Sequence, residues 1–351
     1  MCGAQDTYLR SGRLAAIEKR ADKGYPNDQL ALADAYMSGK GAPQDYSKAA
    51  YWFERAAQNG IPIAEHQIGY LYSVGLGVPR DPIHALHWYQ LAAASGVIRA
   101  KVNMGVIYLE GLGVERDVAR AKELFQQAAE KGLGMGAAYL GVLEIAGVGG
   151  APDRAAAQKW FDLGVKLHDP VSEYALAITY LGDEANARDM HKIADLLRHS
   201  SEKGYVEAKY SLACILLKQP QLARNEREPA QLLEEASQAG EWRATVALGE
   251  IAFRPRSAAL APDPGRAFYY FQLAKLQGCD PAQKTLREDI QSIEKELSSE
   301  EQIREAGQAE AWVAQHHLPL IFVPRGDEAV PAVQDLSASI LGAPALAGAV
   351  Q

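Results

Sequence analysis

Three histidines come close to a spacing that could hold a metal ion. His84 and His87 stand three residues apart and share one face of a predicted helix, and His66 lies on the helix before it. Zinc sites usually combine such histidines with cysteine or carboxylate ligands. Because neither residue type stands at ligand spacing here, we interpret the histidines as surface or packing residues and predict no metal or other cofactor.

A second chemical pattern is the glycine-rich run at residues 132–137. It matches a dinucleotide-binding fingerprint, which requires a strand before the first glycine. Here the run follows a predicted helix and sits at the junction between two helical pairs, so a structural role is favoured. His316 and His317 lie at the end of the last predicted helix, where the helix dipole favours them. No phosphate loop, nucleophile elbow or zincin helix occurs, so we predict no catalytic residue and no enzyme.

The elements that would position any site follow a fixed period. Glycine returns every 36 residues at Gly24, Gly60, Gly96 and Gly132, and the series continues through His168 to Gly204 and Gly240. Such a period is typical of a repeat solenoid, in which each unit buries its apolar face against its neighbours. The sequence therefore predicts an all-α superhelix of about seven helical pairs, and such arrays usually bind other proteins.

Each repeat reads as two helices separated by a glycine loop. Between Gly60 and Gly96, apolar residues at helical spacing predict one helix before Gly75 and a second after Asp81. Asp81 is a good N-cap because its carboxylate accepts backbone N–H groups that the helix leaves unpaired. The equivalent predicted caps are Asp45, Asp117, Asp153, Asp189, Asn225 and Asp263.

The ends of the array are less regular. We predict an N-terminal tail over 1–11, a capping helix over 12–23, repeats over 24–278 and capping helices over 282–318. Residues 319–351 change to proline, alanine, glycine and valine without a helical period, so they are expected to form a low-complexity tail. The solenoid thus spans 12–318.

The chain has 351 residues, 48% of them apolar, and a formal net charge of −8. The apolar content is sufficient for a large core, and the negative charge disfavours nucleic acid as a partner. No stretch reaches the length of about 18 to 20 apolar residues that a membrane helix needs.

The prediction of the cellular compartment rests on the first residues of the chain. Met1, Cys2 and Gly3 are not followed by the apolar run of a secretory signal, so the chain as written is expected to be cytoplasmic. A leading cysteine is also how a mature bacterial lipoprotein begins. A lipid anchor at Cys2, and with it a periplasmic or outer-membrane location, is therefore the alternative.

The face of the first helix of each pair that packing leaves over is the predicted binding surface. Counted from the glycine that opens each repeat, positions 3, 6, 10 and 13 share a stripe that would line the concave side of a solenoid. The stripe is rich in tyrosine and arginine, which are enriched at binding hot spots. Tyr70 and Tyr174 are expected to lie away from packing positions, so that their removal weakens binding without unfolding. The predicted partner-binding residues are His66, Tyr70, Arg99, Val106, Glu110, Val142, Tyr174, Ile178, Tyr210, Arg243 and Glu250.

The repeat also resembles a known family. The run from Ala64 to Gly96, with Gly75-Leu76-Gly77-Val78, Asp81 and Trp88-Tyr89, is similar to the Sel1-like repeat, a relative of the tetratricopeptide repeat, and residues 103–114 fit it as well. The resemblance is most specific over 28–166 and loosens towards 278.

The resemblance implies a right-handed α-solenoid that scaffolds protein complexes, often in bacterial envelope, secretion or signalling systems. Some members are lipoproteins that assist exopolysaccharide export, which gives the anchored alternative. A secreted subfamily with β-lactamase activity carries a cysteine pair in each repeat, and this chain does not, so that activity is the least favoured. The expected function is a non-enzymatic scaffold for protein partners whose identity the sequence does not give.

Overall fold

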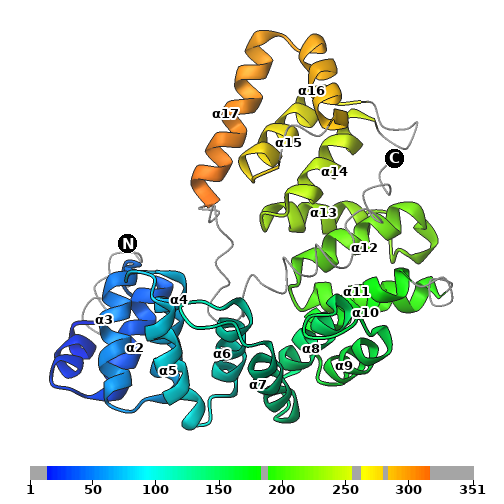
Figure 1. The fold of residues 1–351 in the computed structure, drawn as a ribbon. Helices are drawn as coiled ribbons and strands as arrows, with labels where there is room; N and C mark the ends of the chain where they lie inside the picture. Colours follow the sequence, from blue (N-terminus) through cyan, green and yellow to red (C-terminus); the bar gives the residue numbers. More distant parts are fainter. Residues whose placement is uncertain (1–13, 183–188, 255–261, 280–283, 317–351) are drawn as a thin grey trace. The chain divides into compact units, whose positions relative to one another are not determined.

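The computed structural model describes residues 14–182, 189–254, 262–279 and 284–316. Every regular element in these ranges is helical, which confirms the predicted all-α class (Figure 1). The predicted tails over 1–11 and 319–351, including Cys2, lie outside the described residues. None of the described helices has the length and apolar content to cross a membrane.

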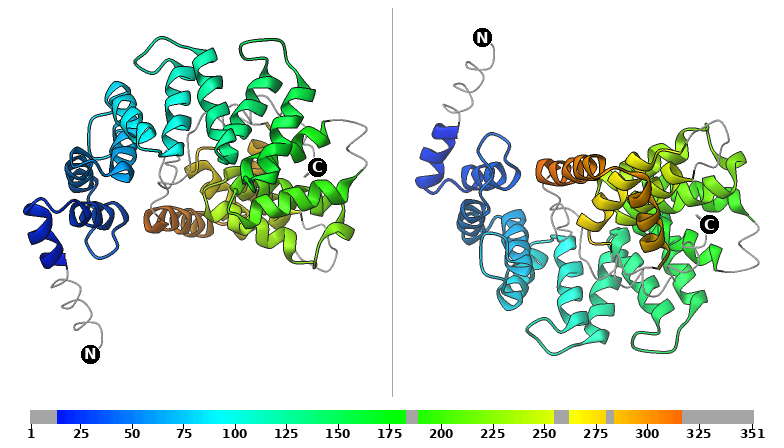
Figure 2. Two further views of the ribbon diagram at one scale, coloured as in Figure 1. Left: turned by 90° about the horizontal axis from the view of Figure 1, so that it is seen from below. Right: turned by 90° about the horizontal axis from the view of Figure 1, so that it is seen from above.

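The helices form two compact units, which divide after Leu167. The prediction of one continuous array over 12–318 stays a prediction. In each pair we call the first helix A and the second helix B, and they pack side by side (Figure 2). After a helix over residues 14–22, the first unit contains α2 (Pro26–Ser38), α3 (Tyr46–Gln58), α4 (Pro62–Val74), α5 (Pro82–Ala94), α6 (Ile98–Glu110), α7 (Val118–Glu130), α8 (Gly134–Ala146) and α9 (Arg154–Lys166).

The second unit begins at His168 and keeps the same order of helices. Its last pair packs against a closing helix, α17, which contacts α15 directly. The helices α16 and α17 fall within the range predicted for the C-terminal capping helices, and their capping role stays a prediction. The unit contains α10 (Pro170–Leu181), α11 (Met190–Glu202), α12 (Val206–Lys218), the 3-10 turn η2 (Pro220–Leu222), α13 (Glu228–Gln238), α14 (Trp242–Phe253), α15 (Pro264–Leu276), α16 (Lys284–Glu296) and α17 (Ser299–His316).

Six of the seven predicted caps are in place. In α5, for example, Asp81 accepts hydrogen bonds from the backbone N–H groups of Ile83 and His84, both at 3.0 Å. The same role is played at the start of the other B helices by Asp45, Asp117, Asp153, Asp189 and Asp263.

The predicted cap at Asn225 is wrong, because α13 begins later, with Arg227 at its N-cap. Here a buried ion pair replaces the usual cap. The Glu228 carboxylate accepts from Arg198 Nε at 3.1 Å and from the backbone N–H of Arg224, so it holds the preceding loop. Both Arg198 and Glu228 are buried, at 8% and 9% exposure, and Arg198 comes from the preceding B helix. A contact across two elements therefore decides where α13 begins.

The glycine that separates repeats is needed for its backbone angle. Gly132 has φ of 86°, in the left-handed region that side chains disfavour. His168, which replaces glycine in the series, takes the same conformation with φ of 59° and is the one non-glycine among the described residues to do so. The following residue, Asp169, caps α10 by accepting from the backbone N–H of Ser172 at 2.8 Å. The period therefore continues through His168.

A second glycine position lets the two helices of a pair approach closely. A Cβ on Gly105 of α6 would lie 2.5 Å from the Phe125 ring of α7, closer than real Cβ atoms come. Phe125 is fully buried and stacks on Tyr139 with ring centroids 4.5 Å apart. The pairs Gly69 with Tyr89, Gly141 with Phe161 and Gly249 with Phe271 repeat the arrangement. In these four pairs, a glycine on the first helix thus makes room for an aromatic ring on the second.

Polar side chains at position 5 of the A helix link it to the end of its B helix. Gln29 accepts from Asn59 Nδ2 at 2.9 Å, and Lys203 Nζ donates to Glu173 at 2.6 Å. Both pairs are 30 residues apart in sequence, so they occupy equivalent places in their repeats. These contacts add a polar connection to the apolar packing in each unit.

Candidate functional site

The A helices of neighbouring repeats lie in register. His66 Nε2 on α4 lies 3.1 Å from Asn103 Nδ2 on α6, a pair that joins position 6 of one repeat to position 7 of the next. In the second unit, Tyr174 on α10 is hydrogen-bonded to Ser211 on α12, which joins the same two positions. Within each unit, equivalent side chains of successive A helices therefore form rows. We call the side chains at positions 3, 6, 10, 13 and 14 of the A helices the A-helix surface.

The apolar members of this surface are more deeply buried than the sequence suggested. Tyr70 and Tyr174 are both 8% exposed, and burial raises the pKa of each phenol to about 12. The expectation that these two tyrosines lie away from packing positions is therefore wrong, since neighbouring helices cover them. Their role in partner binding stays a prediction. The other buried members are Val106 at 4%, Val142 at 2%, Ile178 at 8% and Tyr210 at 7% exposure.

In the first unit, the exposed residues of the A-helix surface lie near the ends of the helices. Arg99, at position 3 of α6, and Glu110, at its C-terminal end, are exposed. Ile63 occupies position 3 of α4 and is 59% exposed. His66 is half-buried, with its ring 5.6 Å from that of Tyr89. Position 3 therefore offers an apolar and a basic side chain on successive A helices.

In the second unit, the structure brings three predicted residues from three A helices together. The guanidinium of Arg243 on α14 lies 5.1 Å from the ring centroid of Tyr210 on α12. Its charge also acts on the buried phenol of Tyr174 on α10. Glu241 fixes Arg243 by accepting from Nε at 2.7 Å and from Nη2 at 2.9 Å. This pairing raises the pKa of Arg243, so the guanidinium stays charged and oriented.

The bidentate pair uses two of the five N–H donors of Arg243. The side chain is 27% exposed, so part of the guanidinium reaches the surface. An arginine held over a tyrosine ring is a residue type and geometry suited to a binding hot spot. Glu250, the remaining predicted residue of α14, is half-buried.

Sequence reasoning missed one residue of this surface, Ile63, and three that contact its members: Asn103, Ser211 and Glu241. Ile63 could have been found, because it shares position 3 with Arg99 and Arg243. Asn103 and Ser211 share position 7, which was not included in the stripe. Glu241 lies before α14 and only its contact with Arg243 reveals its part.

The histidines considered for a metal have other contacts. His84 Nδ1 lies 2.7 Å from Asp81 Oδ2, and its ring stacks on Tyr72 at 5.4 Å. His87 lies beside Trp88, with ring centroids 5.7 Å apart. Over the described ranges, no group of three histidine, cysteine or acidic side chains is placed to hold a metal ion.

The glycine-rich run at 132–137 has the predicted structural role. It directly follows α7, and Gly132 takes the left-handed conformation that ends this helix. A Cβ on Gly136 would lie 2.4 Å from the carbonyl oxygen of Phe125, so this glycine serves the contact between α7 and α8.

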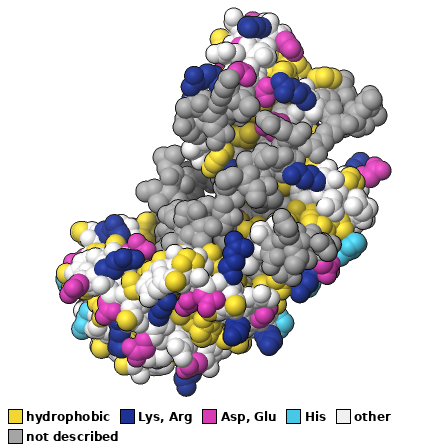
Figure 3. Space-filling view, turned by 45° about the vertical axis from the view of Figure 1, so that its right-hand side comes forward, with side chains coloured by type: hydrophobic (Ala, Val, Ile, Leu, Met, Phe, Trp, Pro, Cys, Tyr) yellow, Lys and Arg dark blue, Asp and Glu magenta, His cyan; other side chains and the backbone are white. Residues whose placement is uncertain are grey.

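Charges on the molecule are mixed in sign. On the face shown in Figure 3, basic and acidic side chains are interspersed among the coloured residues. Such a surface provides no large field of one sign, so partner choice would depend on individual contacts.

Comparison with known proteins is consistent with this architecture. The Sel1 repeat pattern matches residues 26–61, 62–97, 98–133, 135–169 and 244–279, which together make up half of the chain. A Sel1 repeat protein from Oxalobacter formigenes is 24% identical, with a TM-score of 0.54, over 62% of this chain and 89% of that one. At this identity the likeness shows the fold alone.

Two further solved structures are similar at a lower TM-score. A protective antigen of uropathogenic Escherichia coli with an SLR fold is 24% identical, with a TM-score of 0.43, over 86% of this chain and 72% of that one. An immunity protein from Pseudomonas aeruginosa is 20% identical, with a TM-score of 0.47, over 62% of this chain and 83% of that one. No match was found among the curated protein sequences.

Proposed function

The chain belongs to the Sel1 repeat family, whose members are typically scaffolds for protein–protein interaction, and on this premise we propose that it is a non-enzymatic adaptor. In this proposal, partner proteins bind on the A-helix surface of one or both units. The partner is expected to contact side chains from several successive repeats, as in other solenoid proteins.

The observation that supports this proposal is the register of neighbouring A helices. The equivalent hydrogen bonds of His66 with Asn103 and of Tyr174 with Ser211 fix that register in each unit. A partner segment that crosses the helices would therefore contact the same positions in one repeat after another. Side chains fixed in advance lose less conformational freedom on binding, which favours affinity.

The exposed and buried residues of the surface would have different parts. Ile63, Arg99 and Arg243 would contact the partner directly, with Glu110 and Glu250 contributing to partner choice through charge. The buried tyrosines and aliphatic residues would hold these exposed side chains in place. They would contribute little contact area of their own, since they are 2–8% exposed.

Quantitative affinity purification from the cells that produce this protein tests the proposal. Arg99→Glu and Ile63→Glu change exposed side chains, so the fold should persist while bound partners decrease at least about tenfold, the effect of losing one hot spot. The matched control is Arg120→Glu on the B helix α7, where the side chain is 46% exposed.

The control should keep the same partners as the wild-type protein. A loss of partners in Arg120→Glu, together with full retention in both A-helix variants, would place binding on the B helices and contradict the proposal. Circular dichroism of each variant should show unchanged helicity.

We also propose that the protein works in the cytoplasm. Metabolic labelling with a fatty acid, applied to the full gene product, tests the anchored alternative. Label on Cys2 would support an envelope scaffold for secretion or polysaccharide export, and an unlabelled protein in the soluble fraction would support a cytoplasmic adaptor.

A further inference from the structure

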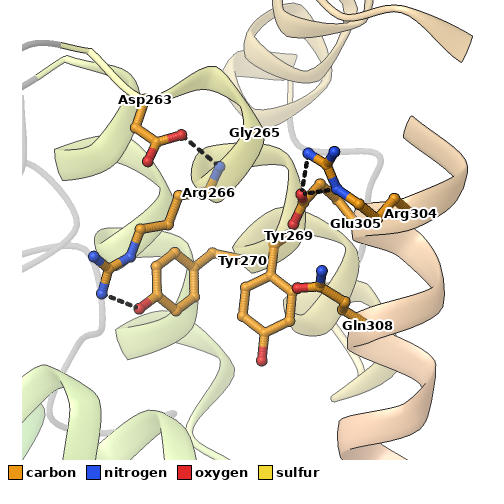
Figure 4. Close-up of a pocket in the computed structure, with 8 residues that line it drawn as sticks. All are labelled: Asp263, Gly265, Arg266, Tyr269, Tyr270, Arg304, Glu305 and Gln308. Carbon is orange, nitrogen blue, oxygen red and sulfur yellow. Dashed lines mark hydrogen bonds and ion pairs between the residues drawn. The ribbon is translucent and has the colours of Figure 1, made fainter. Parts of the chain in front are cut away.

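A cavity of about 490 Å³, wide open to solvent, lies between α15 and α17 in the second unit (Figure 4). This volume falls within the usual range for binding pockets and can take a long side chain with some of its main chain. The cavity shares no residue with the predicted A-helix surface. Its lining consists of Asp263, Gly265, Arg266, Tyr269, Tyr270, Arg304, Glu305 and Gln308.

Two tyrosines form the aromatic part of the wall. Tyr269 and Tyr270 lie next to each other on α15, with ring centroids 5.3 Å apart in an edge-to-face arrangement. Burial raises the pKa of Tyr269, and Tyr270 and Glu305 act in the same direction, so the phenol stays neutral at ordinary pH. Tyrosine faces attract cations through their ring quadrupoles.

Two carboxylates approach the cavity at Gly265. A Cβ built on this glycine would lie 3.6 Å from Asp263 Oδ1 and 3.9 Å from Glu305 Oε1. Both carboxylates therefore lie close to the same point of the wall. Asp263 uses this oxygen to accept from the backbone N–H of Arg266, at 2.9 Å, as the cap of α15.

Glu305 has an unusual counter-ion. Its side chain is 12% exposed, and it accepts from Arg304 Nε at 2.9 Å and from Nη2 at 2.8 Å. Adjacent residues on a helix point to different sides, so Arg304 must fold back to reach Glu305. Arg304 itself is 60% exposed, and ion pairs of exposed side chains contribute little free energy. The carboxylate is therefore held in the wall of the cavity, whereas its counter-ion lies at the rim, largely exposed to solvent, and is easily exchanged.

Arg266 does not compete for this carboxylate. It points away from Arg304, donates to the Tyr270 hydroxyl at 3.2 Å and lies 3.7 Å from Glu234 on α13 (Figure 4). Once Arg304 swings out, the lining residues carry the two carboxylates and the single cation of Arg266.

We propose that this cavity binds a cationic side chain, arginine or lysine, from a basic segment of another protein, and that Arg304 occupies the place of this ligand until it arrives. The incoming cation pairs with Glu305 and lies against the Tyr269 ring, while Arg304 turns to solvent. The net charge of −8 favours the approach of a basic segment. This site stands apart from the proposed adaptor surface and does not depend on it.

Titration of the full chain with blocked tripeptides, followed by NMR of backbone amides, tests the proposal. Three peptides differ in the middle residue alone: glycine–arginine–glycine, glycine–glutamine–glycine and glycine–glutamate–glycine. The arginine peptide should shift the amides of residues 265–270 and 304–308, and the other two peptides should leave them in place.

The variant Arg304→Ala distinguishes whether the cavity binds a cation or an anion. If Arg304 stands in for the ligand, its removal should strengthen binding of the arginine peptide by about threefold or more, the value of an exposed ion pair. Glu305→Gln should weaken binding by about tenfold or more, since it removes a charge-assisted hydrogen bond. Arg287→Ala, on the exposed side of α16, is the matched control and should change nothing.

Two results would overturn the proposal. One is stronger binding of the glutamate peptide together with its loss in Arg304→Ala, which would identify an anion site. The other is the absence of any shift at these amides with the arginine peptide at its highest soluble concentration. Because Arg304 is exposed, its alanine variant is expected to fold, so the test does not depend on Glu305→Gln.

Discussion

Glu65 is a buried carboxylate without a cationic partner among the contacts described for it. It is 6% exposed, and burial raises its pKa, although a hydrogen bond with Ser95 acts in the opposite direction. The first repeat has Gln29 at the same position, 2% exposed and hydrogen-bonded to Ala21 O and to Asn59. A neutral amide therefore fits this place in the repeat.

We predict that Glu65→Gln stabilises the protein at neutral pH by about 1 kcal/mol. A raised folded-state pKa means that the stability from protonated Glu65 is fully present below its unfolded pKa and is lost as pH rises through the folded pKa. The advantage of the variant should thus be near zero below about pH 4 and reach its maximum above the folded pKa. Urea midpoints measured across this pH range provide the check.

Glu173 is the matched control, since it occupies the same position but pairs with Lys203 at 2.6 Å. Its change to Gln should destabilise the protein by about 1–3 kcal/mol, because it weakens the partner of a charged group. If both variants change the free energy of unfolding in the same direction, the pairing with Lys203 does not decide the effect of the substitution.

The left-handed junctions provide a second test at the residue scale. Gly132→Ala should cost about 1 kcal/mol or more from backbone strain alone, since a Cβ there meets nothing within 4 Å. His168→Gly should instead stabilise by roughly 0.5 kcal/mol, the relieved strain minus the added freedom of the unfolded chain. Thermal unfolding of the two variants should shift in opposite directions, and a stabilising Gly132→Ala would contradict the assigned conformation.

At the scale of the element, glycine and aromatic residues set the distance between the helices of a pair. We predict that Gly105→Ala destabilises by about 1–3 kcal/mol through overpacking against Phe125. Ala177 and Ala213 stand at the equivalent position in repeats with leucine in place of the aromatic residue. Adding Phe125→Leu should therefore recover part of the loss.

A double-mutant cycle measures this recovery as a coupling free energy between the two positions. If the free-energy changes of Gly105→Ala and Phe125→Leu are strictly additive, the two positions are not coupled, and the overpacking explanation is wrong. Ala33→Gly, at the equivalent position beside Phe53, controls for helix propensity and should cost no more than about 1 kcal/mol.

The period predicted most elements because most helices begin with a local signal. Asp81 followed by Pro82, and the glycines of the junctions, act within a few residues and fix where helices begin and end. The start of α13 could not be predicted in this way, because the pair of Arg198 and Glu228 joins residues 30 positions apart.

For the candidate surface, residue spacing predicts the helix face but not how deeply its side chains are buried. The spacing of Tyr70 and Tyr174 correctly groups them with the A-helix stripe. Their burial depends on how closely neighbouring helices approach, which the positions of glycine and aromatic residues on other elements determine. The contact of Arg243 with Glu241 likewise depends on side-chain orientation rather than on spacing.

For the whole molecule, the burial of these tyrosines changes what their substitution would show. Tyr70→Ala and Tyr174→Ala should each destabilise by about 3 kcal/mol, comparable with other buried aromatic residues. A loss of binding in these variants would therefore mix stability with recognition. Exposed positions such as Ile63 and Arg99 are the better probes of function.

The proposed adaptor role requires that the A-helix surface, and not the B-helix side, binds partner proteins. Photo-crosslinking in the producing cells tests it directly, with a benzophenone amino acid placed at Ile63 or Arg99 on A helices and at Lys48 or Arg120 on B helices. All four positions are exposed, so the probe should not disturb packing. We predict that the A-helix probes crosslink the same discrete partner and that the B-helix probes do not. Crosslinks from Lys48 and Arg120 to one partner, with none from Ile63 and Arg99, would show that partners bind the B helices instead.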